Sequence, residues 1–181
     1  MLNTATDFGW LSRLIHWLMA AGLIGMLVLG TLIADMEVSL ANLWLYGLHK
    51  TVGLTLLALV LARLVWHRIS PPPKPLPGPA WQATAARWTH RLFYLLLLAI
   101  PLTGWIASSA TGLDVLFADR WVIPPIAPVS EAWETAAFAL HAILTNVLIG
   151  LVALHVAAAL KHAWTGDGTL RRMLLGRAER S

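Results

Sequence analysis

The chain has 181 residues, of which 58% are hydrophobic and only 12% are charged. Soluble globular domains carry about 25% charged residues, so this composition indicates an integral membrane protein. Cysteine is absent, which excludes disulfides, iron–sulfur clusters, covalent haem attachment and thiol catalysis. The formal net charge of +4 does not indicate nucleic-acid binding, because the basic residues fall in loops between apolar stretches.

Four apolar runs predict four membrane-spanning helices, at about residues 10–33, 43–66, 88–110 and 133–163. A run of about 20 apolar residues is sufficient to cross a bilayer. A short turn with Asp35 and Glu37 follows the first run. Residues 71–79 are proline-rich and are predicted to form an extended linker, because dense proline cannot continue a helix. The third run contains Pro101, which a membrane helix tolerates as a kink, and residues 111–130 form the longest loop.

Lysine and arginine predict the orientation of this bundle, because cytoplasmic loops of membrane proteins are enriched in them. The N-terminal segment, the second loop and the tail hold eleven: Arg13, Arg63, Arg68, Lys74, Arg87, Arg91, Lys161, Arg171, Arg172, Arg177 and Arg180. The other side holds only Lys50 and Arg120. We therefore expect an all-α, up-down-up-down four-helix bundle, a single domain over residues 1–181, with both termini in the cytoplasm.

Four histidines fall inside these runs at depths that match in pairs. The first helix runs outward and the second and fourth run inward, so His16 and His155 lie near the cytoplasmic side, and His49 and His141 near the outer side. His141 and His155 are fourteen residues apart, which places them on one helix face about 21 Å apart. Imidazole is expensive inside lipid and indicates a functional site. The depths predict two bis-histidine iron sites, one above the other, holding two haems.

Other interpretations of these histidines remain open. A lone histidine on an apolar face is more often structural than a ligand, although four at complementary depths favour metal binding. A zinc or copper site is the competing interpretation, but zinc normally takes carboxylates or thiolates beside imidazoles, and Glu134 lies only at the start of the last run. Met19 and Met26 are alternative axial ligands, although methionine in an apolar helix usually serves packing.

Several short motifs occur in a specific order along the chain. They are Arg13-Leu14-Ile15-His16-Trp17, His49-Lys50-Thr51-Val52-Gly53, His90-Arg91-Leu92-Phe93-Tyr94, Pro101-Leu102-Thr103-Gly104-Trp105, the segment 155–162 with His141 before it, and Asp167-Gly168-Thr169-Leu170-Arg171-Arg172-Met173. Together they resemble the bacterial cytochrome b561 family of four-helix dihaem membrane proteins. The resemblance covers nearly the whole chain and is weakest in residues 111–130. It implies two haem b groups, with His16, His49, His141 and His155 as the axial iron ligands.

The resemblance also implies an activity and a location. Members of this family pass electrons between the outer surface and membrane quinone, and some oxidise superoxide and reduce ubiquinone. We therefore expect a multi-pass protein of the bacterial inner membrane, surrounded by lipid, with superoxide:ubiquinone oxidoreductase-like activity. The outer loops are net acidic, however, which does not favour an anionic substrate. A relay subunit for a periplasmic redox protein or a dehydrogenase is the main alternative.

Other residues are candidates for binding the haem propionates or the quinone. Propionates are anionic and usually meet basic side chains near the interface, so the candidates are Arg13, Arg63, His90 and Arg91 on the inner side and Lys50 on the outer side. Topology and snorkelling explain such residues equally well. His162 is one heptad beyond His155, about 10 Å deeper towards the cytoplasm. Because the resemblance implies a quinone near this end, His162 is a candidate hydrogen-bond and proton partner, with Trp164 and Lys74 beside it; interfacial belt roles are the alternative.

Overall fold

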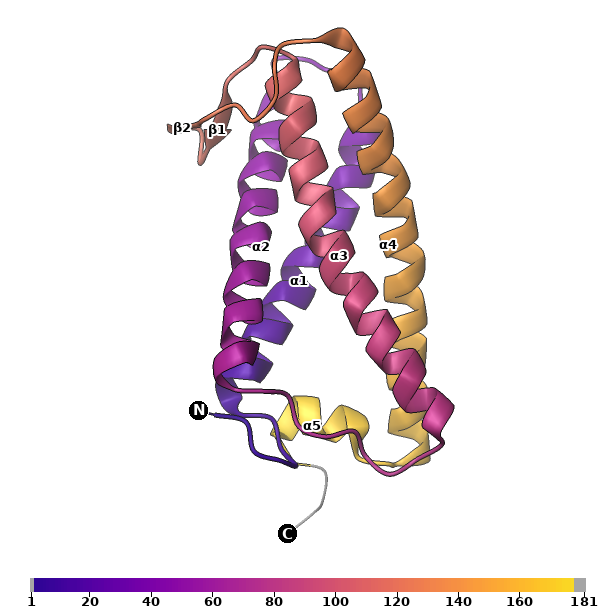
Figure 1. The fold of residues 1–181 in the computed structure, drawn as a ribbon. Coiled ribbons are helices and arrows are strands. Elements are labelled where there is room, and N and C mark those ends of the chain that lie inside the picture. The colour runs from indigo at the N-terminus through magenta and orange to yellow at the C-terminus, as the bar shows by residue number, and fades with distance from the viewer. Residues whose placement is uncertain (1, 178–181) are drawn as a thin grey trace.

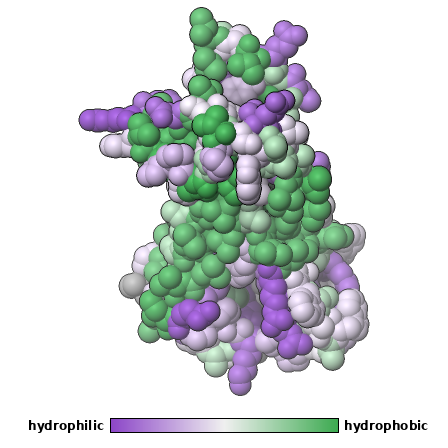
Figure 2. All heavy atoms as spheres, turned by 45° about the horizontal axis from the view of Figure 1, so that its top comes forward, coloured by the Kyte–Doolittle hydropathy of each residue, from purple (hydrophilic) through white to green (hydrophobic). Residues whose placement is uncertain are grey.

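The protein is a bundle of four long helices, seen in a computed structural model that describes residues 2–177 (Figure 1). The helices are α1 (Trp10–Ala34), α2 (Leu43–Ile69), α3 (Ala80–Ala110) and α4 (Glu131–Thr165). Each is long and apolar enough to cross a membrane. Figure 2 shows a band of hydrophobic side chains around the middle of the visible face, with hydrophilic side chains towards both ends. The predicted four-helix membrane bundle is confirmed.

Both ends of the described chain lie at the same end of the bundle, and the loop between α3 and α4 lies at the opposite end (Figure 1). This arrangement agrees with an even number of spans. Which end faces the cytoplasm is still a prediction from the basic residues, and Arg180 of that set lies outside the described residues.

Local sequence explains where the helices begin and end. α4 begins after Ser130, whose hydroxyl accepts a hydrogen bond from the Trp133 backbone N–H at 3.4 Å, and it ends at Gly166, whose φ of 67° suits glycine. α3 begins at Ala80, eight residues before the predicted span, because the flanking residues after Pro79 are alanine-rich helix formers that an apolar-run criterion does not detect. α3 continues through Pro101.

The helices pack as a chain of neighbours: α1 against α2, α2 against α3, and α3 most extensively against α4. Among residues 2–177, the backbone of α4 makes no more than slight contact with α1 or α2. The protein core is correspondingly small, and its most buried large side chains are Val60 and Leu148. Direct packing therefore closes the bundle between α1 and α2, between α2 and α3, and between α3 and α4. Between α4 and α1 the two backbones make at most slight contact.

The long loop contains a hairpin that the sequence analysis did not predict. β1 (Val115–Phe117) pairs antiparallel with β2 (Trp121–Ile123), and the turn residues Ala118 and Asp119 have φ values of 52° and 53°. The hairpin rests on α2, where the Ala118 backbone N–H donates to the Thr51 hydroxyl at 2.9 Å.

A fifth helix, α5 (Thr169–Leu175), folds under the opposite end of the bundle (Figure 1). The Arg13 guanidinium donates to the Leu174 carbonyl at 2.6 Å, and the Trp17 indole N–H donates to the Met173 carbonyl at 3.0 Å. Arg172 of α5 is only 5% exposed and donates to the Lys74 carbonyl at 3.1 and 3.2 Å. α5 thus ties the start of α1 to the proline-rich linker.

Candidate functional site

Two pairs of imidazoles face each other across the bundle. His16 of α1 and His155 of α4 have ring centroids 6.4 Å apart, with an angle of 62° between the rings. His49 of α2 and His141 of α4 have centroids 6.2 Å apart, with an angle of 67°. The structure therefore brings together the same histidines that depth alone had paired.

The spacing within each pair fits one metal ion between two ring nitrogens. A metal–imidazole bond is about 2.0 Å long, and the ring centre lies about 1.1 Å beyond the nitrogen, so two coaxial ligands have centroids about 6.2 Å apart. The two observed separations are 6.4 and 6.2 Å. Direct hydrogen bonding between the two imidazoles would normally bring the rings closer than this. The side chains present therefore fit a six-coordinate iron held by two imidazoles.

His141 is held in the tautomer that a metal ligand needs. Its Nδ1 lies 2.9 Å from the Ile100 carbonyl oxygen and 3.4 Å from the Thr103 hydroxyl oxygen. A carbonyl only accepts hydrogen bonds, so Nδ1 carries the proton. The lone pair is then on Nε2. Metal-binding histidines commonly use their other nitrogen in this way, and the bond fixes the ring orientation.

Glycines let neighbouring helices approach both outer histidines. A Cβ at Gly30 of α1 would lie 3.2 Å from Cε1 of His49, and one at Gly104 of α3 would lie 3.2 Å from Cε1 and Nδ1 of His141. Both distances are closer than ordinary van der Waals contact. Each of these two rings is therefore packed closely against a glycine of a neighbouring helix.

Both histidine pairs join helices that hardly touch. α4 packs directly on α3, whereas its backbone contact with α1 and α2 is slight at most over residues 2–177. A flat macrocycle requires such a separation between the helices that hold it. The donor set, the ring spacing and the helix arrangement therefore all fit haem.

The inner pair has further close neighbours. His90 of α3 has its ring centroid 6.1 Å from that of His155, and Phe93 lies 5.3 Å from the same ring. Arg63 of α2 donates to the Ser12 carbonyl at 3.2 Å, one turn before His16 on α1. His90 and Arg63 therefore belong to the inner site.

The other propionate candidates have different surroundings. Arg13 donates to α5 at the Leu174 carbonyl, and its Nε is buried without a hydrogen-bond partner. Arg91 lies over the Trp88 ring at 4.9 Å, a cation–π contact on the exposed side of α3. Lys50 follows His49 on α2 and is half-buried. The contact with Trp88 gives the Arg91 guanidinium a partner in the structure other than a haem propionate.

The three quinone candidates do not form one cluster. The His162 Nδ1 is paired with the Asp167 carboxylate, Trp164 is 94% exposed, and Lys74 contributes its backbone carbonyl to Arg172. Partial burial opposes ionisation of Asp167. The backbone N–H of Thr169 and the His162 ring outweigh it and hold the pKa of this carboxyl below its usual value. His162 is therefore a hydrogen-bonded group at the end of α4.

Two residues of the inner region were missed by the sequence analysis. His67 of α2 and Tyr94 of α3 lie 3.1 Å apart, from ring Nδ1 to hydroxyl oxygen. His67 lies one turn from Arg63 on α2. This spacing indicates that the two side chains share a helix face, although it does not reveal the partner on α3.

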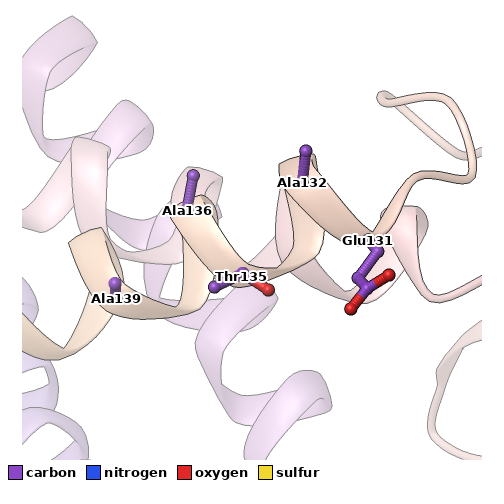
Figure 3. A pocket seen from close by; sticks show the side chains of 5 residues that line it. All are labelled: Glu131, Ala132, Thr135, Ala136 and Ala139. Carbon is purple, nitrogen blue, oxygen red and sulfur yellow. The ribbon is translucent and has the colours of Figure 1, made fainter.

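The remaining features do not compete with the histidine pairs. In the described part of the chain, no three His, Cys, Asp or Glu side chains gather as a closed metal site. Met19 is buried, and the Met26 methyl group lies 3.6 Å from where a Gly53 Cβ would stand, so both methionines serve packing. An open depression of about 480 Å³ lies at the start of α4, at the hairpin end of the bundle. It is lined by Glu131, Ala132, Thr135, Ala136 and Ala139, none of them a predicted site residue (Figure 3).

Comparisons with known proteins agree with this geometry. A family described as Prokaryotic cytochrome b561 matches residues 7–176. Cytochrome b561 homolog 2 of Escherichia coli (strain K12) is 35% identical over 177 residues, which cover 95% of this chain and 93% of the relative. Cytochrome b561 homolog 1 of the same organism is 34% identical over 70% of this chain and 72% of its own length. The probable superoxide oxidase CybB of Yersinia pestis is 27% identical over 72% of this chain and 75% of its own length. With its four apolar helices and facing imidazoles, the chain belongs to the prokaryotic cytochrome b561 family of bacterial multi-pass membrane proteins, which carry electrons with haem b.

Proposed function

We propose that the protein transfers electrons across the bacterial inner membrane through two bis-histidine b haems. His16 and His155 hold the inner haem, and His49 and His141 hold the outer one. Each haem supplies a one-electron couple between ferric and ferrous iron. The observation that carries the proposal is the presence of two facing imidazole pairs, at 6.4 and 6.2 Å, on helices that hardly touch.

The four histidines would hold the two haem irons and would leave them no open coordination position. Iron held in this way would carry single electrons and would not bind oxygen or substrate, so the donor and acceptor would react at the edges of the site. The hydrogen bond from His141 Nδ1 to the Ile100 carbonyl orients the outer ligand. Glycines at positions 30 and 104 confine the outer rings.

The favoured overall reaction is oxidation of superoxide coupled to reduction of membrane quinone. Two superoxide anions lose one electron each and become two oxygen molecules. One quinone takes up those two electrons together with two protons and becomes quinol. The name of the Yersinia pestis relative supports this choice of donor. His162, hydrogen-bonded to Asp167 at the inner end of α4, is the candidate proton partner for the quinone.

A second candidate is a relay that receives electrons from a periplasmic redox protein. Six acidic residues lie in the loops at the hairpin end or in the first turn of α4: Asp35, Glu37, Asp114, Asp119, Glu131 and Glu134. Only Lys50 and Arg120 oppose them. An acidic surface repels superoxide and attracts a basic partner protein.

Stopped-flow mixing separates these two functions. Purified protein in lipid vesicles, prepared either with or without quinone, is mixed with superoxide, and the absorption band of the reduced haem is followed. The superoxide reaction predicts rapid haem reduction, followed by reoxidation only when quinone is present. Negligible reduction by superoxide, together with rapid reduction by a basic redox protein that copurifies, would establish the relay instead.

A further inference from the structure

Arg63, a neighbour of the inner pair, forms a hydrogen-bonded group with His67 and Tyr94, two side chains that have no role in the proposed iron sites. Arg63 and His67 lie one turn apart on α2, and Tyr94 comes from α3. Arg63 Nε donates to the Tyr94 hydroxyl oxygen at 3.3 Å, and that oxygen lies 3.1 Å from His67 Nδ1. Arg63 Nη1 also donates to the Ser12 carbonyl of α1 at 3.2 Å. The group therefore lies where α1, α2 and α3 meet.

One tautomer of His67 gives both the oxygen and the hydrogen of the Tyr94 hydroxyl a partner within this group. A guanidinium can only donate, so the Tyr94 hydroxyl oxygen accepts from Arg63. His67 Nδ1 then serves as the acceptor for the hydroxyl hydrogen, which would have no acceptor within the group if Nδ1 donated instead. A neutral imidazole with an accepting Nδ1 carries its proton on Nε2.

His67 Nε2 is a buried donor without a hydrogen-bond partner among residues 2–177. Nearly all buried polar groups in folded proteins are paired, so an unpaired one points to a group that binds there. The charged group beside His67 is the Arg63 guanidinium, which donates to the same Tyr94 hydroxyl that His67 contacts. Its positive charge favours an anionic oxygen as the acceptor at this position.

We propose that His67 donates a hydrogen bond through Nε2 to a carboxylate of the inner haem. The inference deepens the proposed function and rests on it. Arg63 and Tyr94 connect the two sites. Arg63 donates to the Ser12 carbonyl, one turn before His16 on α1. Tyr94 directly follows Phe93, whose ring centroid lies 5.3 Å from that of His155. Tyr94 is a positioning residue that sets the tautomer of His67.

An anionic lipid headgroup presents the same oxygen chemistry at this end of the bundle. We favour the haem over a lipid headgroup because the hydrogen-bonded group lies between helices: Arg63 of α2 contacts Ser12 of α1, and His67 of α2 contacts Tyr94 of α3. Ser12 is 1% exposed, so this junction is closed to the surrounding lipid on the α1 side.

The test is a redox titration of purified holoprotein that resolves the two haems, with the inner haem identified by its loss in His16→Ala. A donor to a haem carboxylate withdraws negative charge and favours the reduced state. His67→Phe should therefore lower the midpoint potential of the inner haem and leave that of the outer haem unchanged. His67→Gln, which retains a side-chain N–H donor, should restore most of the shift. Tyr94→Phe should produce a smaller shift in the same direction, and Arg68→Gln, at an exposed neighbour, should have no effect.

A second measurement distinguishes a contact of His67 with the haem from a purely structural role of its side chain. Redox-difference infrared spectra with haem labelled with ¹³C at its carboxylates should show a carboxylate band that shifts in His67→Phe and not in Arg68→Gln. Two bound haems with unchanged potential and unchanged carboxylate bands in His67→Phe would overturn the inference and leave the proposed function intact. A shift that appears only when anionic lipid is added would assign the acceptor to lipid and also overturn it. Protein that binds no haem would refute the proposed function itself.

Discussion

At the scale of single residues, His155 has two imidazoles at almost the same distance. The ring of His16 lies 6.4 Å away and that of His90 lies 6.1 Å away, measured between centroids. His90 is on α3, which packs directly against α4, whereas α1 hardly touches α4 in the described structure. A macrocycle needs room between the two helices that hold its iron. His16 is therefore the expected iron ligand, and His90 a neighbour of the haem edge.

His16→Ala should reduce haem from two per chain to about one, because the inner iron loses an axial ligand. His90→Ala should retain both haems. Pyridine haemochrome quantification on the purified variants measures the stoichiometry. Loss of one haem in His90→Ala, with two retained in His16→Ala, would exchange the roles of these histidines.

His162 is the residue whose role is most specific to the quinone end. His162→Ala should keep both haems, because its ring pairs with Asp167 and not with the iron ligands. Quinone turnover should fall by about 10²–10⁴-fold if this imidazole delivers a proton in the slow step. The rate of quinol formation under a steady supply of superoxide measures the effect. Unchanged turnover would show that His162 serves only to hold the connection between α4 and α5 through Asp167.

At the scale of elements, the close approach of α3 to α4 positions the outer ligand. Gly104→Val should displace the His141 ring, since even a Cβ at position 104 would lie 3.2 Å from it. The expected result is selective loss of the outer haem, seen as one haem per chain with the inner spectrum retained. Leu102→Val introduces a branched side chain at the same level of α3, at a position that is 39% exposed, and should keep both haems. Full haem content in Gly104→Val would show that the ring tolerates the contact.

The four long helices were predictable because apolar runs directly reflect the solvent that surrounds a membrane protein. The order of the histidines along those runs was sufficient to predict which imidazoles lie together. The predicted start of the third span at residue 88 omitted the first two turns of α3, because Ala80–Arg87 form a polar, alanine-rich helix outside the apolar run.

The small elements were not predictable from local pattern. The strands β1 and β2 have three residues each, and their turn places Ala118 and Asp119 at positive φ without the Asn-Gly or Asp-Gly signal of a tight hairpin. α5 has seven residues and is positioned by tertiary hydrogen bonds, such as the one from Trp17 to Met173. The pairing of His67 with Tyr94 depends on how α2 crosses α3, which no spacing along the chain reveals.

At the scale of the whole molecule, charge is distributed unequally between the two ends. The end that holds the hairpin is acidic, and the end that holds the termini and α5 carries most of the arginines. This asymmetry predicts the cytoplasmic placement of both termini. It also predicts that an outer protein partner, where one exists, is basic and that its association slows as ionic strength rises.

The proposed function requires two pairs of imidazoles, each with one ring from α4, to hold two haems. A redox titration of the purified protein, combined with pyridine haemochrome quantification, tests this requirement. We expect two haem b per chain, both with the spectrum of a six-coordinate bis-histidine iron, titrating as two separate one-electron steps. A single haem, a five-coordinate spectrum, or a colourless protein that retains zinc would contradict it.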